Sequence, residues 1–187
     1  MKNILTVSAL ALSIFICAPA YSHEEGNGME MMKSSPNAAE APFDIQYLDT
    51  MAEHHREGIK MFKMAIEKSD NQEIKAMAQK MIDDQEEEIP ELKAMRNDIQ
   101  PSAPEAVNMK MPGMMSMDMK ALEATSRAAF DHAFLDMTIK HHQGAVDMSK
   151  NALKSAQSKS VKDKAQMVID MQGKEIAKMK KMREEMK

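Results

Sequence analysis

The sequence predicts an all-α protein: a four-helix bundle made of two repeated helical hairpins, joined by a methionine-rich crossover linker. Apolar residues recur every three or four positions over long stretches, which is the spacing of one face of an α-helix. Residues 43–98 also reappear as residues 130–185 at a constant offset of 87, with 20 identical positions. The alternating runs that would favour strands are absent. Because none of these helices can bury its apolar stripe alone, we expect the two copies to pack together.

The first copy, residues 43–98, predicts two helices. The first begins at Phe43 and ends at residues 69–71, whose polar side chains can cap the next helix. Pro90 lies inside the second helix and has no backbone donor, so we expect a kink near residues 86–90. The apolar stripe of the first helix comprises Leu48, Met51, His55, Ile59, Phe62 and Ile66.

The second copy, residues 130–185, follows the same plan. A polar stretch around residues 157–160 separates its two helices. Between the copies lies the expected linker, residues 99–117, in which three prolines interrupt the helical pattern. The expected bundle, linker included, therefore spans residues 43–187.

Residues 1–22 have the pattern of a secretory signal peptide, with a positive start, an apolar run and a small-residue cleavage site after Ala20 or Ser22. Residues 23–42 are rich in Gly, Ser, Asn, Pro and Ala and predict a flexible tail. The single cysteine, Cys17, belongs to the signal peptide, so we expect no disulfide, thiolate metal site or cysteine nucleophile in the mature chain. We therefore expect a periplasmic or secreted protein. No second long apolar run exists, so no membrane insertion is expected.

The composition narrows the function classes. The chain has 23 methionines and a formal net charge of −4, and this mildly acidic balance argues against nucleic-acid binding. No His has a Glu three residues before it, as a di-iron bundle would need. His-Glu-x-x-His, a Gly-rich phosphate loop and a nucleophile elbow are also missing. We therefore expect a protein that is not an enzyme.

Each copy carries a His-His pair on the apolar face of its first helix. One methionine lies one turn before the first histidine of each pair, and another lies two turns after it, on neighbouring strips of the same face. The earlier methionine is displaced by one residue between the copies, and the later one occupies the same position in both. The candidate metal ligands of the bundle are His54, His55, Met51, Met61, His141, His142, Met137 and Met148.

This mixture of ligands favours copper. Imidazole suits several transition metals, whereas thioether sulfur selects soft ions, so we expect Cu(I) first, with Cu(II) and Ag(I) as further ions. Gln85 and Gln172, and with weaker support Asp49 and Asp136, could orient the imidazoles. The alternative is that the histidines are hydrogen-bonded core residues. Burying four imidazoles costs desolvation free energy that apolar residues would avoid, which favours the metal hypothesis.

The linker provides a second candidate site, with six methionines among the eleven residues 109–119. Closely spaced thioethers in a flexible segment can wrap one soft ion without losing a proton. These candidates are Met109, Met111, Met114, Met115, Met117 and Met119. His23 is a third candidate, because cleavage after Ala20 or after Ser22 would place its imidazole near a free terminal amine that can chelate Cu(II).

Two further polar features favour structural roles. The run Glu86-Glu87-Glu88 predicts a solvated helix face, and His132 predicts a surface or helix-start histidine.

Residues 134–148, with the sequence FLDMTIKHHQGAVDM, resemble the central motif of the CopM-like bacterial family, long filed as a domain of unknown function. The resemblance extends over both copies, roughly residues 43–186. It implies a ferritin-like bundle, a periplasmic copper-binding role linked to copper tolerance, and copper ligation by the eight bundle residues named above. The first copy departs from the motif, with Arg-Glu-Gly at residues 56–58 where the second has Gln-Gly-Ala.

The expected function is therefore a non-enzymatic protein that captures copper and lowers the free ion or passes it to a copper exporter or another periplasmic copper protein. A metal-independent helical adaptor or chaperone with a methionine-rich binding surface is the main alternative. A copper redox enzyme is a second alternative. Whether the two His pairs form one site or two is left open by the sequence.

Overall fold

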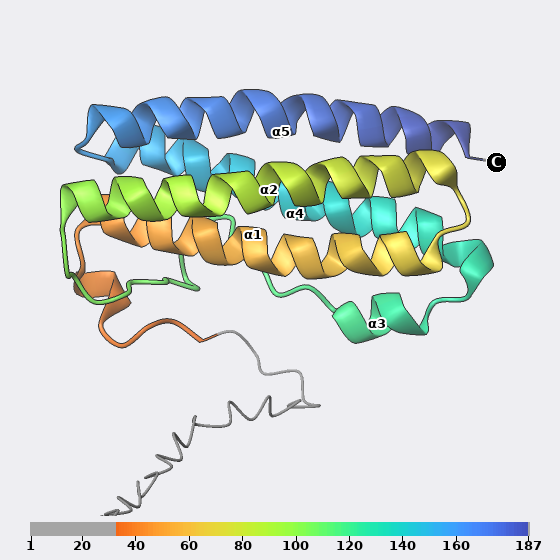
Figure 1. Cartoon of the computed structure of the whole chain (residues 1–187), viewed down its shortest axis with the longest axis horizontal. Coiled ribbons are helices and arrows are strands. Elements are labelled where there is room, and N and C mark those ends of the chain that lie inside the picture. The colour runs from red at the N-terminus through yellow and green to blue at the C-terminus, as the bar shows by residue number, and fades with distance from the viewer. Residues whose placement is uncertain (1–32, 187) are drawn as a thin grey trace, which may run out of the picture. The chain divides into compact units, whose positions relative to one another are not determined.

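The computed structural model describes residues 33–186 and is all-helical over that range (Figure 1). The expected signal peptide, residues 1–22, and residues 23–32 of the expected tail lie outside the described residues. The elements in order are the 3-10 helix η1 (Ala38–Glu40) and the α-helices α1 (Phe43–Lys68), α2 (Gln72–Ile99), α3 (Met119–Ala124), α4 (Arg127–Ser155) and α5 (Lys159–Glu185). None of the helices described is long and apolar enough to span a membrane.

The four long helices form the expected bundle of two hairpins, α1 with α2 and α4 with α5 (Figure 1). The hairpins meet where α1 packs antiparallel against α4. At one end of this contact the Tyr47 hydroxyl lies 2.9 Å from Ser149 Oγ. At the other end the rings of Phe62 and Phe134 meet edge to face, with centroids 6.4 Å apart. These pairs occupy equivalent positions of the two copies, so the hairpins are related by an approximate twofold axis through the α1–α4 contact.

Side-chain caps fix where the helices begin. Asn71 Oδ1 accepts hydrogen bonds from the backbone of Glu73, at 2.9 Å, and of Ile74, at 3.4 Å, and so caps α2. The turn before α5 is held by the other hairpin, because the Asp44 carboxylate accepts from the backbone N–H groups of Gln157 and Ser158. Pro90 lies within α2, which stays a single helix from Gln72 to Ile99. Asp44 therefore ties the start of α1 to the α4–α5 turn.

The segment between the hairpins runs along α1. Asp49 accepts a hydrogen bond from Ala106 N at 2.8 Å, and Thr50 Oγ1 accepts one from Asn108 N at 2.9 Å. Residues 33–42 join this segment, with Ser35 N donating to Val107 O and Ala38 buried. The linker continues into α3, a short helix that the sequence did not predict.

The apolar core contains two large clusters along the bundle, and a small third cluster of Ala38, Ile45 and Ala106 lies where the linker packs on α1. One large cluster contains Phe62, Phe130 and Phe134, and the other contains Tyr47 and Leu48. The stretches of α1 and α4 between them carry the histidines, so the polar candidate site lies in the middle of the bundle.

Candidate metal centre

The four paired histidines form one buried layer between the two apolar clusters, which we call the histidine layer: His54, His55, His141 and His142. None is more than 2% exposed. The rings of His54 and His141 stack across the α1–α4 contact with centroids 3.7 Å apart. Within each pair the centroids are 6.3 Å apart in the first copy and 5.9 Å apart in the second. The fold therefore brings both pairs together at the approximate twofold axis.

His55 and His142, whose rings do not stack on each other, each contact a carboxylate from the second helix of their own hairpin. His55 Nε2 lies 2.9 Å from Glu88 Oε2, and His142 Nε2 lies 3.0 Å from Glu175 Oε2. The expectation of a solvated face for the run Glu86-Glu87-Glu88 is wrong for Glu88, which is 7% exposed because it turns inward to His55. The sequence held one signal for this pair: Glu88 and Glu175 are identical positions of the two copies.

The environment of Glu88 fixes which nitrogen of His55 carries the proton. Burial alone would raise the pKa of Glu88, but hydrogen bonds from His55 and Lys164 outweigh it and lower the pKa to about 2. The group is therefore a carboxylate that accepts, and His55 Nε2–H donates to it. In a neutral imidazole, a proton on Nε2 leaves the lone pair on Nδ1, and Nδ1 of His55 is buried and has no hydrogen-bond partner. This is the arrangement in which metal-binding histidines are commonly oriented by a carboxylate.

The rings of the two stacked histidines, His54 and His141, have only one hydrogen bond between them. His141 Nε2 lies 3.1 Å from the backbone oxygen of His54 and donates to it, whereas both ring nitrogens of His54 lack a partner. Gly58 makes room for this arrangement, because a Cβ at that position would lie 2.7 Å from His141 Cε1. Burial lowers the pKa of His54 to about 3, with further lowering by His55 and His142, and burial likewise places the pKa of His141 well below 6.5. Both imidazoles are therefore neutral at pH 7.

We expect the metal-free protein to lose stability as the pH falls from about 6.5 towards 5. An unfolded His takes up a proton near pH 6.5, whereas His54 stays neutral in the folded state down to about pH 3, so the unfolded state binds more protons in this window. Each such group contributes up to about 1.4 kcal/mol of lost stability per pH unit. Urea unfolding at several pH values measures the slope, and a stability that stays level between pH 6.5 and 5 would contradict it.

The four candidate methionine ligands of the bundle lie on both sides of the layer, two in contact with each large apolar cluster. Met51 and Met148 are fully buried in the same cluster, which also contains Met111 of the linker. At the opposite side of the layer Met61 is fully buried, and its sulfur lies 3.8 Å from Thr138 Oγ1. The antiparallel contact of α1 and α4 therefore places methionine from both hairpins, Met51 and Met148, on one side of the layer. Met137 is only partly buried and packs against the other cluster.

The linker methionines do not gather at one point. Met111 is buried and Met114 packs against the same cluster, while Met117 and Met119 pack at the other end of the bundle. Met115 is 38% exposed, and Met109 is partly exposed. His23 lies outside the described residues. The structure thus places Met111 and Met114 with the cluster that contains Met51 and Met148, and the other four linker methionines are not part of that cluster.

The linker also covers one face of the histidine layer. The backbone oxygen of Gly113 contacts Gly144 of α4 so closely that a Cβ on either glycine would clash. A Cβ at Gly144 would also lie 3.5 Å from His54 Nε2. The glycines of the two copies therefore make different contacts. Gly144, in the Gln-Gly-Ala of the second copy, faces the linker, and Gly58, in the Arg-Glu-Gly of the first copy, faces His141.

The proposed orienting residues form a different set of contacts. Asp49 pairs with Arg96 at 3.4 Å, and Asp136 pairs with Arg183 at the equivalent positions, so neither aspartate orients an imidazole. The side-chain oxygens of Gln85 and Gln172 are buried without a hydrogen-bond partner. Glu88 and Glu175, one turn further along their helices, hold the imidazoles instead.

The imidazoles and methionine sulfurs around the layer are ligands that a soft metal ion prefers, although the four rings do not converge on one point. Within residues 33–186, no three His, Asp or Glu side chains already form a complete metal site. Two imidazoles that bind one ion at about 2.0 Å have ring centres about 5 to 6.5 Å apart, which matches the separations within each pair. The stacked rings of His54 and His141 cannot both point lone pairs at one ion as they lie.

The fold and the site together define a class: all-α bundles with a buried layer of paired histidines. The chain belongs to the DUF305 family, whose model, described as a domain of unknown function, matches residues 18–96 and 97–183. Among solved structures, CopM in the Cu(I)-bound form is 30% identical, with 75% of this chain and 95% of that chain covered and a TM-score of 0.64. CopM in the Cu(II)-bound form is 31% identical, with the same coverage and TM-score.

A fragment of a DUF305 protein from Deinococcus radiodurans is 23% identical, with 76% of this chain and 96% of that chain covered and a TM-score of 0.67, and shares the fold. Among curated protein sequences, none matches the chain. These comparisons establish the family and the fold of the chain.

Proposed function

We propose that the protein binds copper as its cargo at the histidine layer. The observation that carries this proposal is the set of five buried imidazole nitrogens without hydrogen-bond partners: both of His54, and Nδ1 of His55, His141 and His142. Buried polar atoms without partners cost free energy, and a bound metal ion would remove that cost. Neutral His54 and His141 are already in the protonation state that a metal ion needs.

Each His pair suits one ion, with methionine sulfur as the soft partner. The first site would use His54 and His55 with Met51 and Met61, and the second His141 and His142 with Met137 and Met148. Imidazole with thioether favours Cu(I), and the same ligands accept Cu(II) and Ag(I). The linker methionines would collect further Cu(I), and Met111 and Met114 pack in the same cluster as Met51 and Met148. His23 remains a proposed ligand for Cu(II).

The relatives support this choice of metal. CopM has been solved in Cu(I)-bound, Cu(II)-bound and Ag-bound forms, and at about 30% identity over most of its length it shares this chain's fold and family. We extend copper binding from CopM to this chain because the paired histidines are present in both hairpins and are buried together.

The biological role that follows is a non-enzymatic copper carrier outside the cytoplasm. A protein with buried copper sites would lower the free ion or hand it to an exporter or another periplasmic copper protein, and so contribute to copper tolerance. The main rival is a metal-independent adaptor, whose partner binding would be unchanged by a strong copper chelator.

Titration of the metal-free protein with Cu(I) against a competing chelator tests the proposal. We expect wild type to take copper from the chelator, and the variant with His54, His55, His141 and His142 all changed to Ala to lose this tight binding while keeping the weaker linker fraction. Circular dichroism checks that the variant stays helical, and a His132→Ala variant is the matched control. If the folded four-histidine variant binds as much Cu(I) as tightly as wild type, the histidine layer is not the site.

A further inference from the structure

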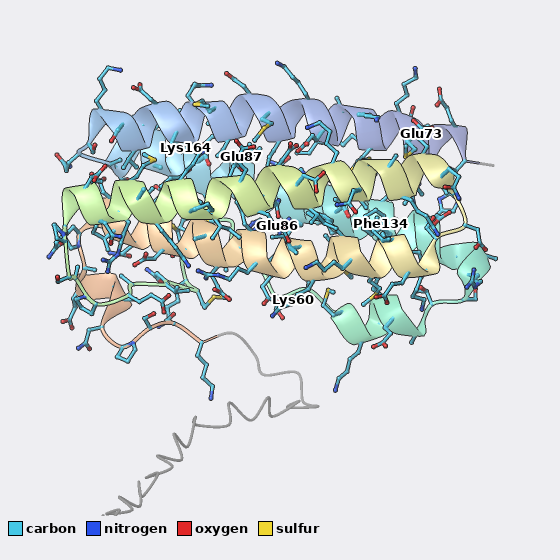
Figure 2. All side chains as sticks on the ribbon, in the orientation of Figure 1. Lys60, Glu73, Glu86, Glu87, Phe134 and Lys164 are labelled. Atoms are coloured by element: carbon cyan, nitrogen blue, oxygen red, sulfur yellow. The ribbon has the colours of Figure 1, made fainter. Side chains whose placement is uncertain are left out.

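The structure leaves one seam of the bundle open above the buried histidines. Helices within each hairpin pack directly, α1 packs against α4, and the linker covers α4 at Gly144. Between α2 and α5 there is instead a groove of about 560 Å³, which we call the α2–α5 groove. Figure 2 shows Lys164 of α5 and Glu87 of α2 along its facing edges.

The floor of this groove leads to the residues that hold the histidines. A small cavity of about 10 Å³, with room for about one water-sized particle, continues below it. Both Glu88 and Glu175 line the groove and this cavity. Gln172, which is 1% exposed, also lines the cavity, and its side-chain oxygen has no hydrogen-bond partner. An ion on the floor would therefore meet an amide oxygen and the two carboxylates that contact the imidazoles directly.

The two carboxylates differ in how far they are open to the groove. Lys164 donates to Glu88 at 2.8 Å and to Glu91 at 2.9 Å, and its own side chain is only 6% exposed, so it covers Glu88. The side chain of Glu175 is 22% exposed and has no Lys or Arg ion pair among the described residues. Glu175 also lines a neighbouring cavity of about 280 Å³, so it is approached from two sides. The position equivalent to Lys164 in the first hairpin is Met77.

We propose that copper reaches the histidine layer through the α2–α5 groove, passing Glu175 and His142, and that Lys164 closes the corresponding path past Glu88 to His55. This inference rests on the proposed copper binding and adds the route and its asymmetry. Six acidic side chains and three lysines line the groove, so its net charge is negative and a cation is attracted. The sulfur of Met171 offers the ion a soft ligand before it meets the imidazoles.

The kinetics of copper exchange distinguish a residue on the entry path from a copper ligand. A residue on the path changes both the binding and the release rate, whereas a ligand changes the dissociation constant. Trp in place of Met171 narrows the groove just above its floor, so it should slow both binding and release of Cu(I) at least fivefold while the dissociation constant changes less than twofold. Lys164→Met introduces the residue found at the equivalent position of the first hairpin, Met77, and should speed both rates at least threefold. Ile99→Trp, at the exposed end of α2, is the matched control and should leave both rates unchanged.

Stopped-flow transfer of Cu(I) to and from a coloured chelator gives both rates, and the relevant phase is the one that the four-histidine variant lacks. If folded Met171→Trp exchanges copper as fast as wild type, and Gly113→Ala, which displaces the linker, speeds exchange instead, the ion passes under the linker and the groove proposal is wrong. That result would leave copper binding itself intact. If wild type has no histidine-dependent phase, the proposed function fails first and the route fails with it.

Discussion

Replacing His54 by Leu is expected to raise the unfolding free energy of the metal-free protein by about 1–3 kcal/mol, because a buried polar group without partners costs about that much. Both ring nitrogens of His54 lack partners, and its side chain is 2% exposed. Leu fills a similar volume and adds no unsatisfied atom. The same change should weaken Cu(I) binding at least tenfold, so stability and function move in opposite directions.

Urea unfolding and chelator competition measure the two effects on the same variant. His132→Leu is the matched control, since His132 lies on α4 outside the histidine layer, and it should change neither quantity by much. A loss of stability in His54→Leu of more than about 1 kcal/mol would contradict the account, because the ring would then be making a favourable contact that its unpartnered nitrogens do not show.

Gly144→Ala is expected to lower the unfolding free energy by about 1–3 kcal/mol through overpacking. Its new Cβ would clash with the backbone oxygen of Gly113, so the linker must move away from α4 and from the edge of the histidine layer. The gain in helix propensity, about 1 kcal/mol, offsets only part of this cost. Thermal or urea unfolding gives the change directly.

Gly173→Ala is the matched control for that change. Gly173 lies in α5, and a Cβ there meets nothing within 4 Å, so this variant should gain about 0.5–1 kcal/mol from helix propensity alone. If both alanine variants are stabilised equally, the linker does not rest on Gly144 as described.

The fold was predictable because its signals are long and repeated. Stripes at three- and four-residue spacing extend over helices of 26 to 29 residues, and the copies repeat them at a fixed offset. The short helix α3 was missed because its six residues follow a Pro/Gly-rich stretch and carry little periodicity. It forms because Asp118 accepts from Ala121 N and Leu122 is buried in the core.

The candidate site was only partly predictable. Adjacent histidines on an apolar face are a local signal, so the pairs could be identified from the residues. Glu88 was missed despite its match to Glu175 in the repeat, because it ends a run of three glutamates that resembles a solvated face, and its burial depends on how α2 rotates against α1. The grouping of Met51 with Met148 depends on the antiparallel register of α1 and α4, which only the packed bundle defines.

Nitrogen NMR of histidine-labelled protein tests whether copper binds the imidazole nitrogens that have no partner in the metal-free protein. Cu(I) is diamagnetic, so the ring nitrogens can be followed through a titration. We expect the Nδ1 signals of His55 and His142 to shift on Cu(I) binding, while each Nε2 keeps the proton that it donates to Glu88 or Glu175. Shifts at Nε2 with loss of those protons, or no shift at any of the four histidines, would contradict this binding mode.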